Sequence, residues 1–158
     1  MKQVALLFLF FFASVCSKAQ MVKKISINEL DNYIRNSNKP MVVNFWASFC
    51  KPCIEEIPYF LESAAKNDSV EMVLVSLDLP DFYPAKVESF LKKRNFLGAT
   101  QFWLNETNAD DFCPRIHPSW QGAMPVTLFV NNNRAYRRFV GRPMTQLQVI
   151  EAFDLLTK

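Results

Sequence analysis

The sequence predicts an α/β protein of three layers, in which helices cover both faces of a central mixed β-sheet. Two observations lead to this prediction. Between residues 26 and 104, apolar β-rich runs alternate with segments of helical periodicity, a pattern typical of parallel strand pairing. A hairpin pattern follows near residues 126–140 and requires antiparallel pairing, so the expected sheet is mixed.

The first predicted elements are a helix, a buried strand and a second helix. Ser26 and Glu29 have the spacing of a capping box, which indicates the start of a helix. The apolar run 41–46 predicts a buried strand. The helix expected from Cys50 onward has apolar residues at helical spacing, and Pro58 within it predicts a kink.

The middle of the chain predicts another strand, helix and strand. Residues 70–77 lack strict alternation, which favours a strand buried on both faces. Residues 84–95 have helical spacing with basic residues in the last turn. Residues 101–104 predict a short strand, and residues 105–121 are expected to be mostly loop with at most a helical turn.

The C-terminal part predicts a hairpin and a last helix. Strands are expected at residues 126–130 and 134–140, joined by the turn-forming residues 131–133. Thr145 is a suitable N-cap for the final helix. We find no internal repeat and no sign of a second domain in the sequence.

The first 19 residues have the pattern of a secretory signal peptide. Lys2 provides a short positive region, and residues 4–15 are apolar apart from one serine. Ser17 and Ala19 place small residues at positions −3 and −1 of a cut after Ala19. The apolar run is shorter than the roughly 20 residues that span a bilayer, which argues against a membrane anchor.

Residues 1–19 are therefore assigned to the signal peptide, and residues 20–158 to one domain of ordinary size. The expected location is the periplasm or cell envelope. A lipid anchor on Cys16 is an alternative, but the preceding Val15 is larger than the small residue that lipoprotein signals carry there.

The charge of the chain argues against a nucleic-acid partner. The formal net charge is +3, and the signal peptide contributes two lysines and no acid, which leaves the domain close to neutral. Four arginines gather between residues 134 and 142, where a charged sheet edge that resists aggregation is the expected structure.

A Cys-x-x-Cys pair, Cys50 and Cys53, stands between the first predicted buried strand and the helix that follows it. A thiol at a helix N-terminus has a lowered pKa, because unpaired N–H groups and the helix dipole favour the thiolate. The second thiol is close enough to close a disulfide with the first. The pair therefore predicts redox chemistry, whereas a structural zinc site would need two further ligands.

Several motifs are shared with a known family over roughly residues 24–157: Asn44 to Cys53 (NFWASFCKPC), Glu56, Pro58, Val75 to Asp78 (VSLD), Gly122 to Thr127 (GAMPVT) and Phe139 to Gly141 (FVG). By these motifs the chain resembles the thioredoxin-fold superfamily and, within it, the exported thiol–disulfide oxidoreductases of the TlpA/ResA type. This resemblance implies a thioredoxin-like α/β/α sandwich. Asn44 replaces the buried acid of cytosolic thioredoxins, which agrees with the exported branch.

The resemblance implies roles for particular residues. Cys50 is the expected nucleophile and Cys53 the resolving thiol. Pro125 matches the family's cis-proline, and Met124 before it matches the residue that offers backbone hydrogen bonds to substrate. Trp46 is expected to pack beside the pair and contact substrate; the alternative is a purely core tryptophan.

Glu56 matches an active-site acid of the ResA-type branch, where it would exchange protons with the thiols. The alternative explanation is that an acid in the first turn of a helix is favoured by the helix dipole alone.

The function expected from these residues is reduction of disulfides in exported proteins, with cytochrome c maturation as a family role. Electrons would come from a membrane thiol donor; no cofactor is expected, and the protein is expected to be a monomer. The competing hypothesis is a copper-binding module that uses Cys50, Cys53 and His117. His117 and the remaining cysteine, Cys113, have no assigned role in the redox hypothesis.

Overall fold

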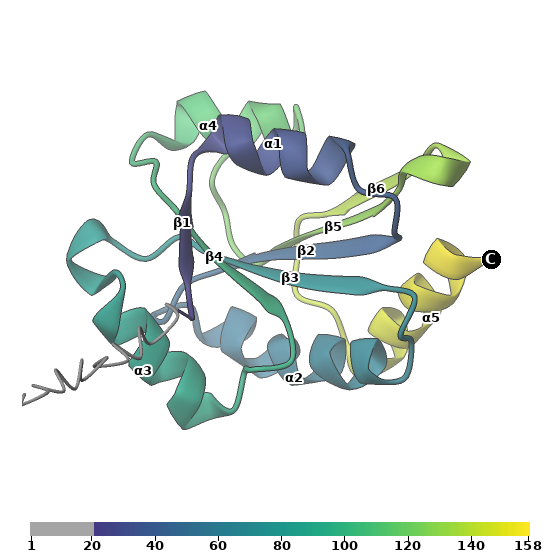
Figure 1. Ribbon diagram of the computed structural model, residues 1–158, viewed down its shortest axis with the longest axis horizontal. Helices are drawn as coiled ribbons and strands as arrows, with labels where there is room; N and C mark the ends of the chain where they lie inside the picture. Colours follow the sequence, from purple (N-terminus) through teal and green to yellow (C-terminus); the bar gives the residue numbers. More distant parts are fainter. Residues whose placement is uncertain (1–20) are drawn as a thin grey trace, which may run out of the picture.

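The computed structural model describes residues 21–158, which form a six-stranded sheet in the order β1-β4-β3-β2-β5-β6 (Figure 1). The strands are β1 (Lys23–Ile25), β2 (Met41–Trp46), β3 (Glu71–Ser76), β4 (Thr100–Leu104), β5 (Val126–Asn131) and β6 (Tyr136–Val140). The helices are α1 (Ile27–Arg35), α2 (Lys51–Ala65), α3 (Ala85–Arg94), α4 (Ala109–Ile116) and α5 (Gln146–Thr157), with short 3₁₀ turns at Pro80–Phe82 and Asn132–Arg134.

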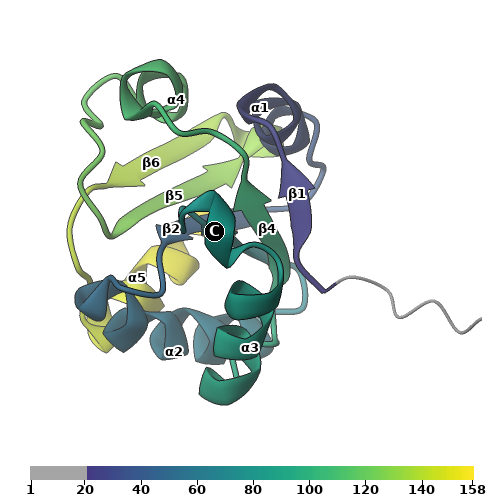
Figure 2. The ribbon, with the colours of Figure 1, turned by 90° about the vertical axis from the view of Figure 1, so that its left-hand side faces the viewer.

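The helices form two layers, one on each face of the sheet (Figure 2). Helices α1 and α4 cover one face, and α2, α3 and α5 cover the other. Strands β1 to β4 are parallel to one another, whereas β5 and β6 are antiparallel to their neighbours. The predicted three-layer sandwich with a mixed sheet is confirmed.

Two elements differ from the sequence expectation. Strand β1 was not predicted, because three residues are too few to show a period, and it is defined only by its pairing with β4 at the sheet edge. Helix α4 extends over eight residues where mostly loop was expected. Asn108 caps it, and its buried Phe112, Cys113 and Ile116 pack on the sheet, so tertiary contacts stabilise the helix although Pro114 lies within it.

Strand β2 determines which side chains reach the redox helix. Successive side chains of a strand point to opposite faces of the sheet. Val43 and Phe45 accordingly pack in the core under α1 and α4, whereas Val42 and Trp46 pack in the core under α2. Asn44 lies between Val42 and Trp46 on this second face, so a polar side chain is directed at α2 from within the sheet.

The predicted signal peptide, its cleavage site and Cys16 lie outside the described residues. Within residues 21–158, no helix combines the length and the apolar character that crossing a membrane requires.

Helix α1 depends on the predicted capping box. Ser26 Oγ accepts a hydrogen bond from the N–H of Glu29, and the Glu29 carboxylate accepts one from the N–H of Ser26. We expect Ser26→Ala to lower the free energy of unfolding by about 1 kcal/mol, because one N–H of the first turn loses its acceptor. Urea titration of this variant beside Ser69→Ala, at an exposed position outside any helix or strand, measures the effect. Equal midpoints for the two variants would contradict it.

Candidate redox site

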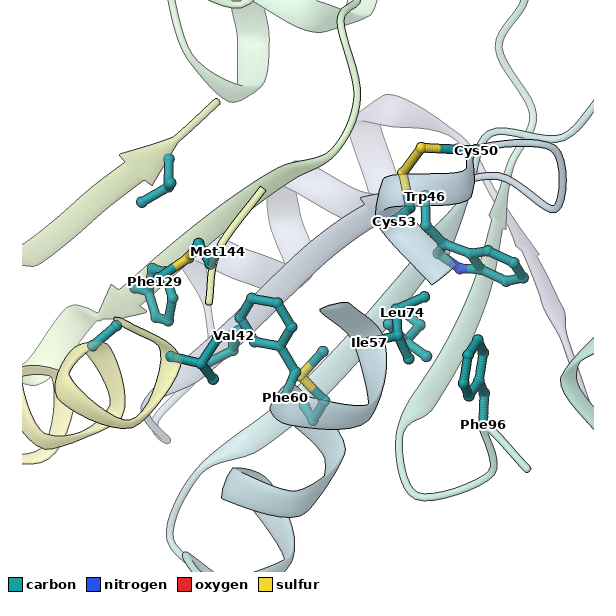
Figure 3. Packing of buried hydrophobic residues seen from close by; sticks show 14 of the residues in the cluster. Val42, Trp46, Cys50, Cys53, Ile57, Phe60, Leu74, Phe96, Phe129 and Met144 are labelled. Carbon is teal, nitrogen blue, oxygen red and sulfur yellow. A yellow bond between two sulfur atoms is a disulfide. The ribbon is translucent and has the colours of Figure 1, made fainter. Parts of the chain in front are cut away.

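Cys50 and Cys53 form a disulfide at the N-terminus of α2, with their sulfur atoms 2.01 Å and their Cα atoms 5.3 Å apart. Cys50 is 9% exposed, whereas Cys53 is fully buried in the core cluster that also contains Trp46 (Figure 3). Of the two cysteines, only Cys50 therefore retains exposed surface that a substrate can contact.

The local sequence places Cys50 at the start of the helix. Cys50 is the N-cap residue: its backbone is extended, its N–H donates to Ala47 O at 3.0 Å, and its carbonyl accepts from the N–H of Ile54 at 3.1 Å. Pro52 lies in the first turn, where a missing N–H costs no helical hydrogen bond. The N–H groups of this turn and the helix dipole favour negative charge on Cys50 once the disulfide opens.

Glu56 lies one helical turn beyond Cys53 on the same buried face of α2 and is 2% exposed. Its Oε1 accepts a hydrogen bond from Asn44 Nδ2 at 2.9 Å, and its Oε2 accepts one from the N–H of Met144 at 2.8 Å. Burial raises the pKa of this carboxyl to about 7, although both hydrogen bonds oppose the change. Glu56 can therefore hold or release a proton near neutral pH.

The helix-dipole explanation of Glu56 does not apply. Helix α2 begins at Lys51, so Glu56 is its sixth residue, and the first turn contains no acid. A buried carboxyl in the second turn gains little from the dipole, whose effect falls off within the first turn.

Asn44 connects the carboxyl to the sheet. It is opposite Thr127 in the antiparallel pairing of β2 and β5, and its Nδ2 donates to Thr127 Oγ1 as well as to Glu56, each at 2.9 Å. Its Oδ1 is buried and has no hydrogen-bond partner among the described residues. The amide therefore retains an acceptor that a protonated Glu56 could use after the amide rotates.

The Met124–Pro125 peptide bond is cis. Pro125 directly precedes Val126, which pairs with Phe45, so this bond lies at the same end of the sheet as Trp46 and the disulfide. Met124 is half-buried beside the core cluster of Trp46 and the two cysteines, which leaves part of it open to a partner chain.

The predicted contact between Trp46 and substrate does not agree with the structure. Trp46 is fully buried, and its indole packs against the rings of Phe90 and Phe96, with centroids 5.6 and 6.4 Å away. Helix α3 and the segment after it thus cover the tryptophan, and its side chain serves the core beside the disulfide.

Phe49, which was not among the predicted site residues, is instead exposed. It is 65% exposed and directly precedes Cys50. Leu79, 63% exposed, follows Asp78, and hydrogen bonds between Asp78 and Ser48 bring these two chain segments together. The signal in the sequence was a large apolar residue in a turn, where neither a strand face nor a helix face is available to bury it.

Cys113 and His117 are not part of this site. Cys113 is buried on α4, across the sheet from α2, where burial raises its thiol pKa to about 11. His117 stacks on Phe139, with ring centroids 4.2 Å apart, and its Nδ1 lies 2.8 Å from Ser119 Oγ. Among residues 21–158, no cluster of three or more His, Cys, Asp or Glu side chains could hold a metal ion. The described structure therefore does not bring Cys50, Cys53 and His117 together, as the copper hypothesis would require.

The sheet order, the disulfide at the start of α2 and the cis bond before β5 together define a thioredoxin-like protein. A family model described as the AhpC/TSA family matches residues 7–135, and the chain belongs to this family.

Similar proteins agree with this assignment. The thiol-disulfide oxidoreductase ResA of Oceanobacillus iheyensis is 48% identical over 109 residues, which cover 68% of this chain and 52% of that protein. The chain thus spans about half the length of this relative. The crystal structure of StoA from Bacillus subtilis is similar with a TM-score of 0.54 and 26% identity, covering 75% of this chain and 85% of that one. A thioredoxin-related protein from Neisseria meningitidis serogroup B has the same fold, with a TM-score of 0.63, 24% identity and coverage of 77% and 87%.

Proposed function

We propose that this protein is an exported thiol–disulfide oxidoreductase that reduces disulfides of other exported proteins through Cys50 and Cys53. The observation that supports this most directly is the asymmetry of the pair. A partly exposed cysteine at the helix N-terminus is joined to a fully buried one, which suits a nucleophile and a resolving thiol.

The proposed cycle begins with the reduced pair. The Cys50 thiolate attacks one sulfur of the substrate disulfide, forms a mixed disulfide with it and releases the other as a thiolate, which takes up a proton. The Cys53 thiolate then attacks the Cys50 sulfur, re-forms the bond between Cys50 and Cys53, and releases the second substrate thiolate. The substrate gains two electrons and two protons, and the protein becomes oxidised.

Glu56 has a specific task in this cycle. The Cys53 thiol is buried and must lose its proton before it can attack, because the thiolate is the nucleophile. The Glu56 carboxyl lies one turn away, is equally buried and has a pKa of about 7, so it is suited to accept that proton.

Substrate binding is assigned to the surface around Cys50. Phe49 and Leu79 provide exposed apolar area on the two segments that Ser48 and Asp78 connect. The backbone of Met124, before the cis bond, is available to an extended segment of substrate. This surface favours a polypeptide substrate with apolar residues near its disulfide.

The proposal that the protein is exported is supported by the signal-peptide pattern of residues 1–19. An exported reductase needs a thiol donor in the membrane, because no glutathione buffer is available there. The haem-binding thiols of c-type cytochromes are one proposed substrate class.

The test is the equilibrium of the Cys50–Cys53 pair with a thiol buffer of known potential, followed by mass spectrometry of alkylated protein. A reductase is expected to have a potential near that of thioredoxin, about −270 mV. A potential near −120 mV, typical of a strong oxidant, would contradict the proposed direction of electron flow.

A further inference from the structure

Asp78 is a buried carboxylate that the proposed cycle does not use. It is 3% exposed and lies two residues beyond the end of β3. We propose that Asp78 is a positioning residue, which holds the turn from Ala47 to Cys50 so that the Cys50 sulfur stays at the N-terminus of α2. This inference rests on the proposed function, because it concerns the reactivity of the same thiol.

The carboxylate binds the turn directly. Asp78 Oδ1 accepts hydrogen bonds from the N–H and the Oγ of Ser48, at 3.0 and 2.6 Å. Asp78 Oδ2 accepts one from Ser76 Oγ at 2.8 Å, and that hydroxyl accepts one from the N–H of Asp78 at 3.1 Å. The charged acceptor thus has donors on both oxygens, and hydrogen bonds to a charged group are the stronger kind.

Asp78, which anchors the turn, is itself fixed to the sheet. The indole N–H of Trp103, in β4, donates to the carbonyl of Asp78 at 2.8 Å. The N–H of Leu77 donates to the carbonyl of Trp46 at 2.8 Å, which joins the end of β3 to the end of β2. Through Asp78, the turn is therefore connected to β3 and β4, and its side-chain hydrogen bonds to Asp78 are made by Ser48.

The anchoring role of Asp78 and its negative charge predict opposite effects on the reaction rate of the Cys50 thiol. A negative charge near a thiol disfavours its thiolate, so removing charge alone would make Cys50 react faster. Removing the anchor lets the sulfur leave the helix N-terminus, so Cys50 would react more slowly. Asp78→Asn removes the charge but keeps an oxygen for Ser48, whereas Asp78→Ala removes both.

The experiment measures alkylation of Cys50 by iodoacetamide in the reduced full-length protein near pH 7, with peptide mass spectrometry to identify the modified cysteine. We expect Cys50 of Asp78→Ala to react about tenfold more slowly than Cys50 of the protein without a substitution. A change of about tenfold corresponds to the free energy of a favourable interaction with a helix terminus. Asp78→Asn should stay within about threefold. Asp81→Ala, an exposed aspartate three residues further along, is the matched control and should react at the original rate.

Ser48→Ala removes one hydrogen bond from the anchor and serves as the milder variant if Asp78→Ala does not fold; a slower reaction, by about threefold, is expected from it. Unchanged rates in folded Asp78→Ala or Ser48→Ala would leave Asp78 a merely structural residue and overturn the proposal. Faster reaction in both Asp78 variants would assign the effect to charge and also overturn it. Alkylation requires no disulfide substrate. Failure of the proposed reductase activity would therefore be detected in a separate assay of the protein without a substitution.

Discussion

Replacing Cys50 with serine is expected to lower the rate of disulfide reduction at least about a thousandfold, because no other described thiol can take its place. Cys53 is fully buried, and Cys113 is buried across the sheet on α4. The measurement is the rate at which the reduced protein converts a protein disulfide to thiols.

Replacing Cys53 with serine should have a different result. Cys50 can still attack, but the mixed disulfide cannot be resolved within the protein and accumulates. Mass spectrometry without reductant should detect protein joined to one substrate chain through Cys50. Cys113→Ser is the matched control and should turn over normally. If Cys53→Ser turns over at the original rate and no mixed disulfide is detected, the two-thiol cycle is excluded.

The sequence carried enough information for the layers of the fold and for the redox pair. The apolar run of β2 and the helical spacing of α2 are visible in the sequence, and Cys50 and Cys53 stand at the junction of these two elements. The short strand β1 could not be predicted, because pairing with β4 creates it.

The contacts of the site depend on tertiary structure. The position of Glu56 three residues after Cys53 suggested a role, but its raised pKa results from burial beneath the loop that contains Met144, 88 residues further along. The burial of Trp46 results from helix α3, and the sequence of β2 contains no information about that cover.

The stability of the oxidised protein is expected to fall as the pH rises, because of Glu56. Its pKa is raised from 4.5 to about 7, so between these values the native state holds a proton that the unfolded chain has released. The native state then binds more protons, and the free energy of unfolding decreases with pH. The contribution is fully present below about pH 4.5 and is lost as the pH passes 7, a total of roughly 3 kcal/mol.

Glu56→Gln should remove this dependence. Urea titrations of both proteins at pH 5 and pH 8 measure the difference between them, in which the effects of other titrating groups cancel. The difference should change by roughly 2 kcal/mol over this range, with the variant the more stable at pH 8. If the difference in free energy of unfolding between the two proteins were the same at pH 5 and pH 8, Glu56 would be excluded as the titrating group.

The reason the variant should fold lies in Asn44. The introduced glutamine can keep the hydrogen bond from the N–H of Met144 through its carbonyl, but its amide then faces Asn44 Nδ2. Rotating the Asn44 amide by half a turn presents Oδ1, which has no partner in the described structure and can accept from both the introduced amide and the Thr127 hydroxyl. A protonated Glu56 would bind the rotated amide in the same way. The partnerless oxygen of Asn44 can thus serve as the acceptor for a protonated Glu56, whereas the Asn44 amide donates to the ionised form.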